Sequence, residues 1–166
     1  QLAGIVHFDQ PLAPKAAAEC TVDVACSTGD AALDAAIAQR KKSMARIHFV
    51  DGGRAFVCTG TLIDTEKFPT PYFLTANHCV GREEVAASIT SFWFHEAAAC
   101  GSGTARPDSR QVAGGMAIEF ADPNTDHTLL VMNASPPSGA KFSGWNAAPL
   151  ANGATVTSLS HPAGDV

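Results

Sequence analysis

A histidine beside a cysteine, at the end of an apolar segment, is the part of this sequence best suited to chemistry. Residues 71–80 read PYFLTANHCV, so an apolar strand over 72–74 leads through small and polar residues to His78 and Cys79. A disulfide from Cys79 to Cys58, which lies in an upstream apolar strand, would clamp two neighbouring strands. A general-base histidine needs such rigidity, because proton transfer fails unless the imidazole lies within hydrogen-bond reach of its partner.

A second candidate is an aspartate directly before another apolar strand. Residues 125–130 read TDHTLL, which places Asp126 at the start of a buried segment. A carboxylate next to an imidazole fixes the tautomer of the ring and stabilises the imidazolium that forms in acyl transfer. Such an aspartate alone is more often a turn or cap residue, so the catalytic interpretation depends on His78.

The composition limits the class of protein. The chain has 166 residues, of which 46% are hydrophobic and 16% charged, which is typical of one folded domain or slightly more. A net charge of −5 provides no basic patch for nucleic acid or an anionic membrane, and the sequence contains no run of 18 apolar residues. We therefore expect neither a nucleic-acid nor a membrane partner. The first residues also lack the pattern of a signal peptide.

The cysteines indicate an oxidising compartment. There are five, Cys20, Cys26, Cys58, Cys79 and Cys100. None forms a C-x-x-C pair, and His78 with Cys79 has no third ligand at suitable spacing, so a zinc site is disfavoured. Wide spacing favours disulfides and hence a secreted protein. Because five is odd, one cysteine must be free or must pair outside the chain.

The remaining pattern predicts one helix among many short strands. Residues 1–19 read as an extended lead-in, 31–40 as a short helix after the capping residues 27–30, and 51–53 as a hairpin turn. The predicted strands cover residues 20–26, 45–50, 54–63, 72–75, 88–95, 111–120, 128–133, 142–145 and 154–160. Short strands at this spacing favour an antiparallel barrel or sandwich.

Five motifs together resemble a known family. In order they are CTVDVAC at 20–26, YFLTANHC at 72–79, DHTLL at 126–130, GW at 144–145 and HP at 161–162. The set resembles a chymotrypsin-fold serine endopeptidase, and most closely its bacterial lysyl endopeptidase branch. The resemblance covers about residues 20–166.

The resemblance implies an all-β fold and half of a catalytic site. It implies a six-stranded antiparallel barrel over 20–140, the first of two, with one short helix, after an extension over 1–19. Residues 141–166 would then contain the first strands of a truncated second barrel. His78 would be the general base and Asp126 would orient it. The nucleophilic serine would lie beyond Val166, in a second chain or a missing segment, and no cofactor is expected.

The resemblance also implies the disulfide pairing. Cys58 would pair with Cys79, Cys26 with Cys100, and Cys20 with a cysteine of the partner segment. The chain alone would then be inactive. The substrate would be a protein or peptide, and a preference for lysine follows from the branch alone.

Other residues and classes have simpler explanations. Loop or packing roles are favoured over catalysis for Ser102, Ser138, Ser143, His95, His127 and His161. One alternative function is a non-catalytic, protease-like binding module in which the serine of the missing part is replaced. Another is a cysteine nucleophile on the same fold.

Overall fold

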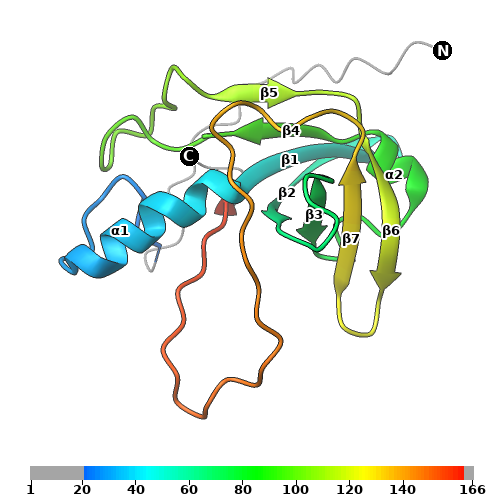
Figure 1. The fold of residues 1–166 in the computed structure, drawn as a ribbon. Helices are drawn as coiled ribbons and strands as arrows, with labels where there is room; N and C mark the ends of the chain where they lie inside the picture. The colour runs from blue at the N-terminus through cyan, green and yellow to red at the C-terminus, as the bar shows by residue number, and fades with distance from the viewer. Residues whose placement is uncertain (1–20, 163–166) are drawn as a thin grey trace.

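A single antiparallel sheet of seven strands forms the framework of the computed structural model, which describes residues 21–162. The strands are β1 (Met44–Asp51), β2 (Arg54–Ile63), β3 (Tyr72–Thr75), β4 (Thr90–Trp93), β5 (Arg110–Val112), β6 (Met116–Asp122) and β7 (His127–Met132). Their order across the sheet is β5-β4-β1-β2-β3-β7-β6 (Figure 1). The helical elements are α1 (Ala31–Arg40), the short 3-10 helix η1 (Lys41–Ser43) and α2 (Glu83–Ala87).

The predicted all-β class is confirmed, and several elements begin and end where the sequence indicated. Helix α1 and strands β2 and β3 cover the expected residues. The Asp30 side chain caps α1 by accepting hydrogen bonds from the backbone N–H groups of Ala32 and Leu33. Within the described part of the chain, no helix is both long and apolar enough to cross a membrane.

One face of the sheet encloses the core. Alternate residues of β1 and β7 are buried, which is the period-two pattern of a strand with one covered face. The largest fully buried side chains include Trp93, Phe73, Ile47, Leu62, Ile89 and Leu130. Phe73 of β3 and Trp93 of β4 meet edge to face, with ring centroids 6.0 Å apart. The core therefore connects β3, the strand that precedes His78, with β4, which is separated from it in the sheet by β2 and β1.

The six-stranded closed barrel is not what the structure contains. The sheet has seven strands, with β5 and β6 at its edges, and no strand pairing among the described residues joins these edges. Strand β5 is only three residues long, and β6 is irregular between Ile118 and Phe120. A short strand and a bulged strand both terminate pairing, which explains why the hydrogen-bonded sheet remains open.

The strand predicted at 20–26 is absent over its described part, residues 21–26. Asp23 folds this segment into a turn instead. Its carboxylate accepts a hydrogen bond from the Ala25 N–H at 2.8 Å, and its carbonyl accepts one from the Cys26 N–H at 2.8 Å. Aspartate side chains commonly compete with strand pairing in this way.

Helix α2 was not predicted, because its five residues are too few to show a helical period.

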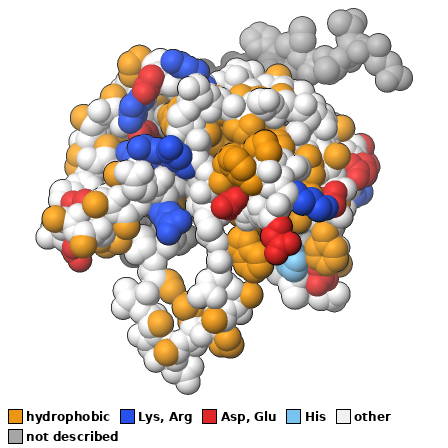
Figure 2. Space-filling model, in the orientation of Figure 1, with side chains coloured by type: hydrophobic (Ala, Val, Ile, Leu, Met, Phe, Trp, Pro, Cys, Tyr) orange, Lys and Arg blue, Asp and Glu red, His pale blue; other side chains and the backbone are white. Residues whose placement is uncertain are grey.

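The two strands predicted after β7 are also absent. Residues 142–145 and 154–160 belong to a long loop that extends away from the sheet (Figure 1). Only Ser143 pairs with the sheet, through an isolated bridge to Ile63. Among residues 21–162 no strand pairs with most of this loop, so its backbone forms no ladder of hydrogen bonds there. Apolar side chains gather on it (Figure 2), and Trp145, Leu150 and Val156 are exposed.

Gly60 allows β2 and β3 to approach each other closely. A Cβ atom at this position would lie 2.1 Å from Cε1 of Phe73 and 2.8 Å from the carbonyl oxygen of Leu74. We expect Gly60→Ala to lower the free energy of unfolding by about 1–3 kcal/mol, because the buried Phe73 ring must move. Denaturant titration measures the change. Gly144→Ala is the matched control, since a Cβ at Gly144 meets no atom within 4 Å. Equal losses in the two variants would contradict this explanation.

Candidate active site

The pairing of β3 with β7 brings the two candidate residues together. Thr75, the last residue of β3, lies opposite Thr128 near the start of β7. His78 follows β3 by three residues, and Asp126 comes immediately before β7. Because the strands are antiparallel, the end of one and the start of the other lie at the same end of the sheet. Residues 48 positions apart in sequence thus meet at one place.

Asp126 contacts His78 at two points. One carboxylate oxygen, Oδ1, accepts a hydrogen bond from the backbone N–H of His78 at 2.8 Å. The other, Oδ2, lies 2.7 Å from the imidazole Nδ1. The two contacts hold both the backbone and the ring of His78 relative to a single carboxylate, which restricts rotation of the imidazole.

The charge on Asp126 determines which ring nitrogen carries the proton. The backbone N–H of His78 and then its imidazole lower the pKa of the Asp126 carboxyl below its usual value. An ionised carboxylate can only accept hydrogen bonds, so Nδ1 of His78 must be the donor. In the neutral ring the other nitrogen, Nε2, is then unprotonated and able to accept a proton. This is the tautomer that a general base requires.

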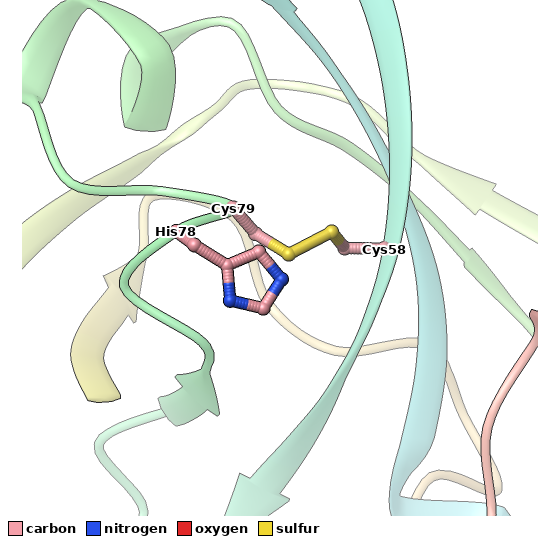
Figure 3. Close-up of side chains that lie close together, drawn as sticks. All are labelled: Cys58, His78 and Cys79. Carbon is pink, nitrogen blue, oxygen red and sulfur yellow. A yellow bond between two sulfur atoms is a disulfide. The ribbon is translucent and has the colours of Figure 1, made fainter. Parts of the chain in front are cut away.

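The His78 segment is held by a helical turn and a disulfide. The backbone N–H groups of Cys79 and Val80 both donate to the carbonyl of Ala76 at 3.2 Å. Cys79 is disulfide-bonded to Cys58 of β2, and the imidazole of His78 lies beside this bond (Figure 3). The structure also contains a Cys26–Cys100 disulfide, so both pairs implied by the resemblance are formed. Cys20 lies outside the described residues.

The same cluster does not suit a metal ion. Ligand atoms of Cys58, His78 and Cys79 lie within 4.8 Å of one another. The two sulfurs are bonded to each other, however, and neither can be the thiolate that a metal ion needs. The cluster is better described as a histidine held beside a structural disulfide.

The two candidate residues are open to solvent. The side chains of His78 and Asp126 are 72% and 51% exposed. Within residues 21–162, the only hydrogen-bond partner of the His78 imidazole is Asp126. Ser102 bonds within its own loop, and Ser143 bonds the hydroxyl of Ser43 at 2.7 Å. None of the serines among residues 21–162 is therefore hydrogen-bonded to the His78 imidazole.

The other histidines have separate partners. His127 is bonded through Nδ1 to the Thr125 hydroxyl at 2.6 Å and stacks against Phe120. His161 is placed at Thr59 of β2, where its backbone N–H donates to the hydroxyl at 2.9 Å and its Nδ1 lies 3.0 Å from the same oxygen. The contact attaches the end of the long loop to the sheet.

Acid is expected to weaken the attachment of His161. Burial, together with the charges of His95 and Arg46, lowers the pKa of His161 from 6.5 to about 4. The unfolded chain therefore binds more protons between these values, and stability is lost as the pH falls from 6.5 towards 4. We expect a loss on the order of 2–3 kcal/mol from this group, measured by denaturant titration across this range. His161→Gln should remove that part of the pH dependence, and an unchanged profile would contradict the assignment.

A histidine–aspartate pair with this geometry is the arrangement found in hydrolases of the serine protease type. A family profile described as "Lysyl endopeptidase, C-terminal domain" matches residues 15–166. The chain belongs to the lysyl endopeptidase family. The resemblance found in the sequence motifs is thereby confirmed.

Two individual proteins illustrate the relationship. Lysyl endopeptidase of Pseudomonas aeruginosa is 34% identical over 155 residues, which cover 90% of this chain and 33% of the relative. The chain thus spans about a third of the length of that protein. A solved structure titled "Structure of GrC" is 19% identical, with a TM-score of 0.36. The alignment covers 72% of this chain and 48% of the GrC chain.

Proposed function

We propose that this chain supplies the general base and the orienting acid of a serine endopeptidase. The observation that carries the proposal is the two-point contact between Asp126 and His78, which leaves Nε2 of the imidazole free to accept a proton. Membership of the lysyl endopeptidase family supports the same reaction. The family name also suggests cleavage at lysine, a preference that we include in the proposal.

The proposed reaction is a two-step acyl transfer. The nucleophilic serine attacks the peptide carbonyl while Nε2 of His78 takes the hydroxyl proton. The imidazolium, stabilised by Asp126, then gives the proton to the leaving amine. In the second step His78 takes a proton from water, which attacks the acyl-enzyme, and the proton passes to the serine as the acid product leaves. Oxyanion donors and the side-chain pocket belong to the part that carries the serine.

We further propose that this part is a second barrel, begun by residues 141–166 and completed by another chain or segment. Three observations support it. The catalytic pair is largely exposed, the long loop presents apolar side chains, and the chain covers only a third of its relative. A disulfide from Cys20 would keep the parts together, and the two described disulfides fit a secreted protein.

Mass spectrometry of the intact protein tests the linkage. Purified protein should release a partner fragment on reduction if Cys20 is bonded to a separate chain. A single 17.2 kDa species before and after reduction would contradict the two-chain arrangement.

A non-catalytic binding module is the alternative, and a serine-directed reagent separates it from an enzyme. A phosphonofluoridate should label the complete protein at one serine and abolish peptide hydrolysis in proportion to labelling. Labelling requires the imidazole as base, so His78→Ala should prevent it. Absence of labelling and of peptide hydrolysis in the folded complete protein would favour the binding module. Hydrolysis that resists the phosphonofluoridate but is abolished by iodoacetamide would indicate a cysteine nucleophile.

A further inference from the structure

Asn77, the residue before His78, joins the two segments that carry the catalytic pair. Its backbone N–H donates to the carbonyl of Asp126 at 3.2 Å. Its side-chain amide Nδ2 donates to the hydroxyl of Thr128 at 3.0 Å. Asn77 thus makes two hydrogen bonds to the segment that carries Asp126. Its backbone bonds Asp126 itself, and its side chain bonds Thr128.

The acceptor at Thr128 is fixed by the core. Thr128 is fully buried, and its strand neighbour Thr75 is also buried and donates its hydroxyl to the carbonyl of Thr59 at 3.0 Å. A buried β-branched side chain has little rotational freedom. The bond from Asn77 therefore ends on a rigid point of the sheet, whereas His78 and Asp126 are exposed.

The backbone of Asp126 needs such support. Its φ angle is +53°, in the left-handed region that residues other than glycine seldom adopt. Aspartate tolerates this region better than most residues, and contacts from neighbouring segments stabilise it further. Asn77 holds the carbonyl of this residue, and Thr128, two positions later, holds the side chain of Asn77.

We propose that Asn77 and Thr128 form a positioning clamp that fixes the distance between the His78 imidazole and the Asp126 carboxylate. The clamp acts through the backbone of the two catalytic segments and does not touch the reacting atoms. Its consequence for catalysis rests on the proposed function, whereas its effect on the His78–Asp126 bond does not.

Two substitutions of Thr128 separate the hydroxyl from the shape of the side chain. Thr128→Val removes the acceptor at nearly constant volume, and Thr128→Ser keeps the hydroxyl. Asn77→Ala removes the donor. Asn133→Ala is the matched control, because the Asn133 amide also donates one bond at 3.0 Å, to the carbonyl of Gly114 beyond the other end of β7.

The first readout is the tautomer of His78, measured from imidazole ¹⁵N shifts of the complete protein at a pH where the ring is neutral. We expect the Nδ1–H form to dominate in the wild type, in Thr128→Ser and in Asn133→Ala. Thr128→Val and Asn77→Ala should shift the ring towards the Nε2–H form. An unchanged tautomer in both variants would overturn the clamp.

The second readout is peptide hydrolysis by the complete protein. Thr128→Val and Asn77→Ala should lower kcat by about 10-fold with little change in KM, because only the transition state depends on the alignment of the base. Thr128→Ser should recover most of the activity. A loss equal in Thr128→Ser and Thr128→Val would overturn the role of the hydroxyl. An inactive wild type would contradict the proposed function, and the tautomer measurement would still decide the clamp.

Discussion

Replacing His78 by alanine is expected to lower kcat/KM for peptide hydrolysis by the complete protein about 10⁴- to 10⁶-fold. Without the imidazole no group in contact with Asp126 can take the proton of the nucleophile, and the losses measured in serine proteases lie in this range. Hydrolysis of a lysyl peptide substrate by wild type and variant measures the effect.

The loss should be specific to the base. His78 is 72% exposed, so its removal leaves the core intact, and the thermal unfolding midpoint should stay close to that of the wild type. His127→Ala is the matched control, because it removes a neighbouring histidine whose ring is hydrogen-bonded to Thr125, whereas the His78 ring is hydrogen-bonded to Asp126. Activity retained in His78→Ala, or lost equally in His127→Ala, would contradict the assignment of the base.

Asp126→Asn is expected to lower kcat by about 10⁴-fold while the fold is retained. The amide that replaces the carboxylate can donate to Nδ1, which favours the tautomer with the proton on Nε2 and so blocks the base. Asparagine is the suitable substitution, because it tolerates the left-handed backbone at φ +53°, whereas alanine would add strain. Steady-state kinetics and the imidazole ¹⁵N shifts of His78 measure the two effects.

The pH dependence distinguishes the carboxylate from a merely structural group. Because hydrogen bonds from His78 lower the pKa of Asp126, its charged form persists as the pH falls and is lost only below that lowered pKa. The wild type should therefore keep the Nδ1–H tautomer at every pH where the imidazole is neutral. In Asp126→Asn the Nε2–H form should replace it throughout. Equal tautomer populations in both proteins would contradict the role of Asp126.

Local patterns in the sequence predicted helix α1 and strands β2 and β3, whereas the single strand predicted at 111–120 is divided between β5 and β6 at opposite edges of the sheet. Helix α1 has an aspartate cap at its start, and β2 and β3 are rich in apolar and β-branched residues and are bounded by turn residues. These features depend only on residues close together in the sequence, so they can be recognised without knowledge of the fold. The predicted strands at 142–145 and 154–160 carried similar signals and were wrong, because a strand also needs a partner beside it.

The sequence by itself determined the residue types available for chemistry and their order, His78 before Asp126, with cysteines near the base. Only the tertiary structure decided how they meet. The register of β3 with β7 places His78 against Asp126, and the clamp between Asn77 and Thr128 depends on the same register. The alternation of apolar residues shows which face of a strand is buried, but it does not identify the distant strand that pairs with it.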